Sequence, residues 1–128
     1  MREIRFRAWH KEKKIMREVV SIGWTSCGMG NVLVVGELME NPSVYELMQF
    51  TGLYDKNGKE IWKGDIIDSS SSKEIVVYNE ERARFEMQSI NDVVPIKVFL
   101  KGQNEVDNIE VLGNIYENPE LLENKHGK

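Results

Sequence analysis

Polar and apolar residues alternate at the start of the chain in the pattern of a half-buried β-strand. One side of this extended segment holds the apolar residues Ile4, Phe6 and Ala8. The other side holds three cations and an indole, which are Arg5, Arg7, Lys11 and Trp9. A polar stretch at residues 10–14 separates this segment from a second β-like run at residues 15–20. Residues 3–20 are therefore predicted to form a β-hairpin with a turn longer than two residues.

The next part of the chain predicts a loop, a strand and a short helix. Residues 21–31 contain three glycines and are interpreted as the end of a strand followed by a loop. The β-branched run at residues 32–35 predicts a short strand. Ser43 has the place of an N-cap, and Glu46 stands three residues later as in a capping box. We therefore predict a short helix from Ser43 to Met48.

The clearest turn in the sequence is Asn57-Gly58, which stands between two apolar stretches of residues 51–62. Both central residues of a type I′ turn need a positive φ, which Asn and Gly tolerate best. A tight two-residue hairpin is expected here. Asp65 follows Gly64, and its carboxylate is expected to accept backbone N–H bonds and to fix where the next strand begins.

The rest of the chain predicts further short strands. They lie at residues 74–78, 82–87, 93–100 and 107–116, and a four-serine loop at residues 69–72 precedes them. Asn118-Pro119 predicts the start of a helical turn through Leu122, and residues 126–128 are expected to fray. Many short strands with at most two small helices are typical of a mainly β, barrel-like domain.

The composition changes this picture little. The chain has 128 residues, of which 41% are hydrophobic and 30% charged, as expected for one ordinary domain or two very small ones sharing a core. No apolar run approaches the roughly 20 residues needed to cross a bilayer, and no export signal follows Met1. Cys27 is the single cysteine, which excludes an internal disulfide. We therefore expect a cytoplasmic protein that does not bind membranes.

Charge is distributed unevenly along the chain. Residues 1–17 carry seven basic and two acidic side chains, a net +5, so the other 111 residues sum to −9 within the total of −4. A basic face that meets an anionic partner, or a contact between unlike halves of two subunits, would explain this asymmetry. For a small domain with a sequence pI near 5.3, a role in solubility alone is the favoured explanation.

The sequence offers little for catalysis or metal binding. Its two histidines, His10 and His126, stand far apart in polar segments that we expect to be exposed, and no zinc-ligand spacing occurs. Cys27 is a candidate nucleophile, but only His10 is available as its base and nothing in the spacing brings them together. We therefore predict no catalytic residue, no metal and no cofactor.

Nucleic-acid binding is the alternative that the residues support better. The predicted face of Arg5, Arg7 and Lys11 offers cations for phosphate, and Trp9 among them offers a plane for base stacking. The acidic total and the small number of positions count against this hypothesis. The other aromatic residues are expected to be packed in the core or half-buried: Trp24, Trp62, Phe50, Phe85 and Phe99.

Three blocks of the sequence resemble the YopX family of phage and prophage proteins. They are residues 1–9 (MREIRFRAW), residues 47–67 (LMQFTGLYDKNGKEIWKGDII) and residues 113–122 (GNIYENPELL). They stand in the order found in that family and together span nearly the whole chain. The resemblance implies an SH3-like β-barrel in residues 51–118, preceded by an N-terminal β region at residues 1–50 and followed by a short helical turn and tail at residues 119–128. It implies no reaction, because the family's biochemical role is uncharacterised.

The function expected from these observations is that of a non-catalytic phage or prophage accessory protein. The first hypothesis is a protein-interaction module that forms homo-oligomers, or binds a phage or host protein, through strand edges or its basic N-terminal face. The second is nucleic-acid binding through Arg5, Arg7, Trp9 and Lys11.

Overall fold

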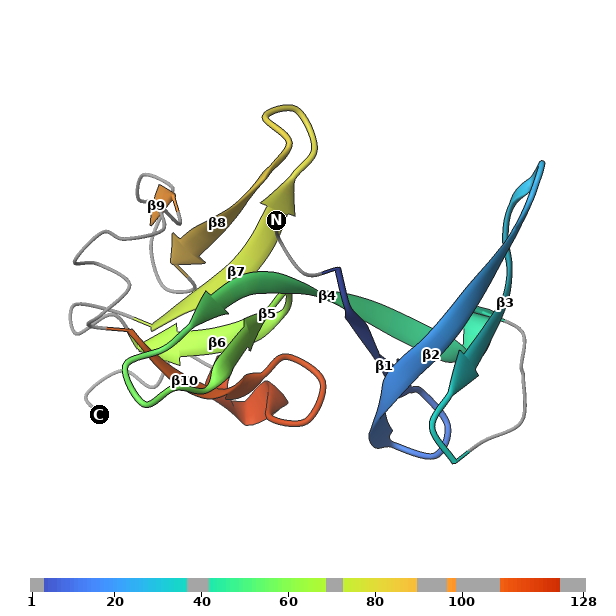
Figure 1. The fold of residues 1–128 in the computed structure, drawn as a ribbon. Helices are drawn as coiled ribbons and strands as arrows, with labels where there is room; N and C mark the ends of the chain where they lie inside the picture. The colour runs from blue at the N-terminus through green and yellow to red at the C-terminus, as the bar shows by residue number, and fades with distance from the viewer. Residues whose placement is uncertain (1–3, 37–41, 69–72, 90–96, 99–108, 123–128) are drawn as a thin grey trace. The chain divides into compact units, whose positions relative to one another are not determined.

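The computed structural model describes residues 4–36, 42–68, 73–89, 97–98 and 109–122, and the described chain is mainly β (Figure 1). Its ten strands form two antiparallel five-stranded sheets, and its two helices are 3₁₀ helices of three and four residues. The chain divides into two compact units, Met1–Phe50 and Thr51–Lys128, called here the first and the second unit. No helix in the described ranges is long and apolar enough to span a bilayer.

The first unit is built around strand β1 (Phe6–His10), which lies between two antiparallel neighbours. Ala8 is opposite Arg17 of β2 (Ile15–Thr25) and opposite Leu47 of β4 (Tyr45–Tyr54). β2 also pairs with β3 (Gly28–Val34) on its other edge. The predicted hairpin of β1 and β2 is confirmed, and the predicted strand at residues 32–35 corresponds to the end of β3.

The predicted helix from Ser43 to Met48 is wrong. Helical geometry is confined to η1 (Pro42–Val44), and Tyr45 already begins β4. An isolated helix of less than two turns is unstable, whereas residues 45–49 gain a full antiparallel ladder with β1. Strand pairing therefore decides the conformation against the local capping pattern.

The core of the first unit is small. It consists of Ala8, Val32, Val34 and Tyr45, against which Val19, Met29, Val44 and Leu47 pack. Met48 and Phe50 of β4 are also buried, with 1% of each exposed.

The second unit contains the end of β4 and the remaining strands. These are β5 (Glu60–Trp62), β6 (Asp65–Asp68), β7 (Lys73–Asn79), β8 (Arg84–Ser89), β9 (Lys97–Val98) and β10 (Glu110–Asn114), followed by η2 (Pro119–Leu122). β5 neighbours β4, and the others form a sheet in the order β10-β6-β7-β8-β9. The core of this unit is larger and consists of Ile61, Ile67, Val76, Phe85, Met87, Ile109 and Val111.

The hairpin at Asn57-Gly58 exists, but its turn is not the predicted type I′. Gly58 has a φ of 81° and Asn57 has no positive φ. The N–H of Gly58 donates to the carbonyl of Asp55 at 3.0 Å, and the N–H of Asp55 donates to the carbonyl of Lys59 at 2.8 Å. This pattern belongs to a three-residue loop in which a type I turn is followed by a glycine in the left-handed region.

Buried polar groups hold the second unit together. The Asp65 carboxylate accepts the N–H of Trp62 at 2.7 Å, which confirms the turn role predicted for Asp65. The Thr51 hydroxyl donates to the carbonyl of Ile61 at 2.8 Å. The Asn114 side-chain oxygen accepts the N–H groups of Tyr116 and Glu117 at 3.0 and 2.9 Å, and so closes the turn after β10.

The strand predicted at 74–78 corresponds to β7, and the predicted helical turn after Asn118 corresponds to η2. The strands predicted at 82–87 and 107–116 overlap β8 and β10, which begin at Arg84 and Glu110, and residues 107–108 lie outside the described residues. The serine loop at 69–72, most of the strand predicted at 93–100 and the tail at 126–128 lie outside the described residues. The described strands form no closed barrel, so SH3-like closure stays a prediction.

Candidate partner-binding groove

The four residues predicted to form a nucleic-acid face do not form one. Trp9 is buried with 9% of its surface exposed, and its neighbours Ala8 and His10 on the other face of β1 are buried too. The Arg5 guanidinium lies 5.1 Å from the centre of the Phe50 ring, where its charge faces an aromatic surface. Arg7 is half-buried, and Lys11 forms an ion pair with Glu46 at 3.6 Å. The indole predicted to stack on bases is therefore packed in the protein.

His10, expected to be exposed, is buried with 2% of its surface accessible. Its Nδ1 accepts the N–H of Lys13 at 3.0 Å, and its ring meets Tyr45 edge-on at 5.1 Å between centroids. His10 thus organises the turn between β1 and β2, where Lys14 has a φ of 59°. Cys27 is exposed and lies beyond the opposite end of β2, so the structure does not bring the candidate nucleophile and its candidate base together.

No group of three or more histidine, cysteine or acidic side chains is placed to hold a metal ion among the described residues. The carboxylates of Asp55 and Asp65 instead accept backbone N–H groups. Three donors reach Asp55: Asn57 and Lys59 at 2.8 Å, and Val111 at 2.9 Å. Burial tends to raise the pKa of Asp55, but these three bonds and the nearby Lys59 ammonium together hold it below its ordinary value.

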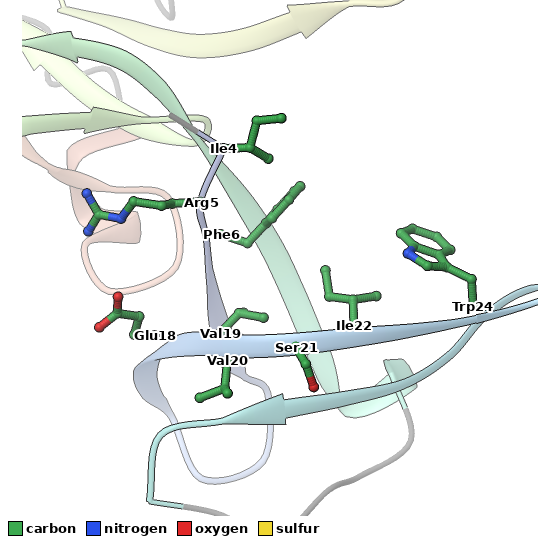
Figure 2. A pocket seen from close by; sticks show the side chains of 9 residues that line it. All are labelled: Ile4, Arg5, Phe6, Glu18, Val19, Val20, Ser21, Ile22 and Trp24. Carbon is green, nitrogen blue, oxygen red and sulfur yellow. The ribbon is translucent and has the colours of Figure 1, made fainter. Parts of the chain in front are cut away.

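A groove opens in the first unit where two neighbouring strands separate. The ladder between β1 and β2 begins at His10 opposite Ile15 and ends at Arg7 opposite Glu18. β1 stays with β4 beyond this point, and β2 stays with β3. The cavity between them has a volume of about 310 Å³ and is lined by residues 4–6 and by residues 18–22 and 24 (Figure 2).

A β-bulge in β2 determines which side chains face this groove. The ladder with β3 steps from Val19 opposite Val34 to Ser21 opposite Leu33, so Val20 is the extra residue. Figure 2 shows the side chains of Val19, Ile22 and Trp24 on one side of β2 and that of Val20 on the other. Regular alternation would place Val19 and Ile22 on opposite sides. The bulge therefore assembles an apolar row along β2.

The opposite wall of the groove carries the apolar side chains of Ile4 and Phe6 next to Arg5. Ile4 and Phe6 project from the start of the chain on the side of β2 that carries Ile22 and Trp24 (Figure 2). Ile4 is 70% exposed and Trp24 is 68% exposed. The expectation that Trp24 is packed in the core is wrong, whereas Trp62, Phe50 and Phe85 are buried as predicted. Phe99 lies outside the described residues.

Residues 19–34, which form a twisted two-stranded hairpin called here the arm, carry no charged side chain. The uncharged stretch extends to Gly36, in a chain that is 30% charged. Charged residues commonly protect exposed strand edges from other chains. This gap in the charge pattern was visible in the sequence, and it is the signal that would have directed attention to Ile22 and Trp24.

The arm is shaped by its own side chains. The Thr25 hydroxyl donates to the carbonyl of Gly28 and accepts the N–H of Cys27, both at 3.1 Å. A Cβ on Gly23 would come within 2.5 Å of the Asn31 side-chain oxygen, and a Cβ on Gly30 within 2.8 Å of the Thr25 methyl. A side chain at either place would require Asn31 or Thr25 to move.

Comparisons with known proteins agree with the resemblance noted in the sequence. A model of the YopX protein family matches residues 5–123. The crystal structure of EF1440 from Enterococcus faecalis is similar with a TM-score of 0.74 and 27% identity, covering 96% of this chain and 100% of that one. The crystal structure of YopX from Bacillus subtilis has a similar fold, with a TM-score of 0.56, 21% identity, and 94% and 97% coverage. The comparison with curated proteins gives no significant match.

Proposed function

We propose that the chain, which belongs to the YopX family, is a non-catalytic protein-interaction module that binds another polypeptide at the groove of its first unit. The observation that carries this proposal is the 68% exposure of Trp24 on an arm without charges. Exposed apolar patches of this kind mark interaction sites in soluble proteins. Trp is also the residue type most enriched among those that dominate binding energy.

The backbone of β2 supports binding of an extended segment. Residues 19–25 pair with β3 along one edge, and the described ladder with β1 on the other edge ends at Glu18. An extended polypeptide that pairs with this edge would gain main-chain hydrogen bonds, as in β-augmentation. Its apolar side chains would then pack against Ile22 and Trp24.

The charge of the arm favours a protein over a nucleic acid. Nucleic-acid affinity depends on cations that neutralise phosphates, and residues 19–36 contain none. Of the predicted contributors, Arg5 lines the groove but its guanidinium lies over the Phe50 ring, and Lys11 pairs with Glu46.

The proposal includes three further features. The second unit is assigned an SH3-like barrel, supported by its matching family motifs and its run of short antiparallel strands. A role as an accessory protein of a phage or prophage is supported by the resemblance of the three sequence blocks. A reducing compartment such as the cytoplasm agrees with a single exposed thiol at Cys27.

Affinity capture from prophage-carrying cells tests the proposal. The wild-type protein is expected to retain a partner that the double variant Ile22→Ser, Trp24→Ser loses. Leu112→Ser changes an apolar residue of similar character, 36% exposed on β10, and is expected to retain it. Retention on DNA or RNA at low salt that falls steeply as salt rises, and that is unaffected by the arm variants, would overturn the proposal in favour of nucleic-acid binding.

A further inference from the structure

We infer that the occupant of the groove is the arm of a second copy of this chain, paired antiparallel to β2 so that Ile22 of each copy lies opposite Trp24 of the other. This inference rests on the proposed function, because it names the partner of the same groove. In the proposed dimer the two arms form one continuous four-stranded sheet in the order β3-β2-β2-β3 across a two-fold axis. The two apolar rows then form one layer.

The position of the apolar row determines this register. Directly opposed residues of an antiparallel pair point to the same side of the sheet. Ile22 and Trp24 already share a side of β2 (Figure 2), so opposing them across the axis keeps all four side chains in one layer. Each contact is then an aromatic residue against a β-branched one, which is a favourable cross-strand pair. The axis passes at Gly23.

The charge pattern agrees with a second copy as the occupant. A two-fold contact brings the same surface together twice, so any charge near the axis meets its like. Residues 19–36 have no charge to repel. In this register the last residue of β2, Thr25, lies opposite Ser21 of the second copy, so the paired stretch holds only neutral residues and Glu18 lies outside it. The arm is therefore complementary to itself.

The groove provides a second wall for the incoming strand. Ile4 is 70% exposed on the β1 side, and Phe6 is half-buried beside it. In a dimer the second arm would cover these residues together with Trp24, and so would remove from water three apolar side chains that the single chain leaves accessible. Removal of apolar surface from water is the main favourable term in such associations.

A charge-complementation experiment tests both the partner and the register, using the full chain. Ile22→Glu and Trp24→Lys are made as separate proteins, and circular dichroism checks that each is folded. Each variant alone places a charge opposite an apolar residue, so its self-association is expected to weaken by at least about a hundredfold. In an equimolar mixture the introduced carboxylate of one protein meets the introduced ammonium of the other in one half of the contact. The original pair of Ile22 and Trp24 remains in the other half, so a mixed dimer is expected in sedimentation velocity.

Trp24 provides an independent optical measurement. Trp9 and Trp62 are 9% and 5% exposed, so the exposed indole of Trp24 dominates the change when the arm is covered. The emission maximum of the wild type is expected to shift to shorter wavelength as protein concentration rises, and that of Trp24→Phe is expected to stay constant. Leu112→Ser serves as the matched control and is expected to associate as the wild type does.

The outcomes separate this inference from the proposed function. A wild type that is monomeric at all concentrations overturns the inference, and the proposed function still stands if capture of another protein depends on Trp24. A dimer that is unaffected by Ile22→Glu and Trp24→Lys also overturns it. A dimer that is weakened by both variants but not restored in their mixture overturns the proposed register and with it the inference as stated.

Discussion

The two units of the chain differ in the charged and apolar side chains that their strands carry. In the second unit, charged groups such as Glu86 are drawn in and bonded: its carboxylate accepts Arg84 Nε at 2.7 Å and Asn79 Nδ2 at 3.1 Å. In the first unit the arm has no charge and exposes Trp24 to water. The Glu86 carboxylate thus finds its partners within the chain, whereas Trp24 at the end of the apolar row stays 68% exposed. This difference is the reason for placing the proposed intermolecular contact on the arm.

The hydrophobic cores of the two units also differ in size. Among the described residues, seven form the core cluster of the second unit and four form that of the first, beside which Met48 and Phe50 are also buried. Small domains bury a smaller fraction of their surface and are correspondingly marginal, and a two-stranded hairpin is marginally stable by itself. We therefore expect the first unit to gain more from a partner than the second.

Truncation of a core residue in the second unit should have the largest effect on stability. Ile67 is fully buried within the core cluster, so Ile67→Ala is expected to lower the free energy of unfolding by about 2–5 kcal/mol. Trp24→Ser removes a larger side chain from an exposed position and is expected to change it by less than about 0.5 kcal/mol in dilute monomer. Urea denaturation followed by circular dichroism measures both. Equal losses would mean that Trp24 is part of the folding core, which would remove the contrast between the units.

Removal of the Asp55 carboxylate should be the next largest effect. The Asp55 oxygens accept N–H groups from Asn57, Lys59 and Val111 and so join the hairpin loop to β10. Asp55→Asn replaces one acceptor oxygen by an NH₂ group that faces a backbone donor, and it is expected to cost about 1–3 kcal/mol. Urea denaturation at neutral pH measures the loss.

The same carboxylate predicts how stability depends on pH. Burial raises the pKa of Asp55, but the N–H donors and Lys59 lower it more, so its pKa in the folded state lies below the ordinary 3.8. Its stabilising contribution is complete above pH 3.8 and is lost as the pH falls through the lowered pKa. Asp55→Asn should therefore show a smaller loss of unfolding free energy at low pH than the wild type does. Glu86, whose pKa is lowered by the hydrogen bond from Arg84, should contribute a further loss at low pH that is absent in Glu86→Gln. If Asp55→Asn loses as much stability at low pH as the wild type, Asp55 is not the source of this pH dependence.

The hairpin at Asn57-Gly58 shows what local sequence can predict and what it cannot. The reversal of the chain follows from residues within the turn, and it is found there. The predicted type I′ geometry is wrong, because it was drawn from Asn57-Gly58 alone and left out Asp55, whose Oδ1 accepts the N–H groups of Asn57 and Lys59. The bond from Val111 to the other Asp55 oxygen joins residues 56 positions apart, and a pattern of neighbouring residues carries no information on it.

The two tryptophans of the first unit show the same limit for the candidate site. Alternation predicted an exposed Trp9, but the three consecutive residues Ala8, Trp9 and His10 are all buried, so side chains on both faces of β1 are covered. Trp24 was expected to be buried because of its residue type, and the arm exposes it. Most strands could be read from the sequence, with the start of β4 at Tyr45 an exception, whereas the exposure of each strand's side chains could not. The uncharged run of residues 19–36 is the one feature of the groove that composition alone records.

A smaller effect is expected at the glycine of the same loop. Gly58 has a φ of 81°, and a Cβ added there meets no atom within 4 Å. Gly58→Ala therefore costs only the backbone strain of the left-handed region, about 1 kcal/mol. Thermal denaturation should show a slightly lower midpoint than that of the wild type. A loss as large as that of Asp55→Asn would indicate a steric conflict that the open space around Gly58 does not predict.

The smallest effect is expected at two non-glycine residues with a positive φ, one in each unit. Lys14 in the turn after β1 and Ala83 in the turn before β8 have φ values of 59° and 54°, a region that costs a side-chain-bearing residue about 1–2 kcal/mol. Replacement by glycine removes this strain but increases the freedom of the unfolded chain by about 0.4–1 kcal/mol. Lys14→Gly and Ala83→Gly are therefore each expected to stabilise the protein slightly, by less than about 1 kcal/mol. The N–H of Lys14 donates to the carbonyl of the buried His10 at 2.8 Å, and a more flexible glycine at this position weakens that bond. The gain in unfolding free energy should therefore be larger for Ala83→Gly than for Lys14→Gly. Parallel thermal denaturation of the two variants measures the difference, and a larger gain from Lys14→Gly would show that the turn of the first unit is the more strained of the two.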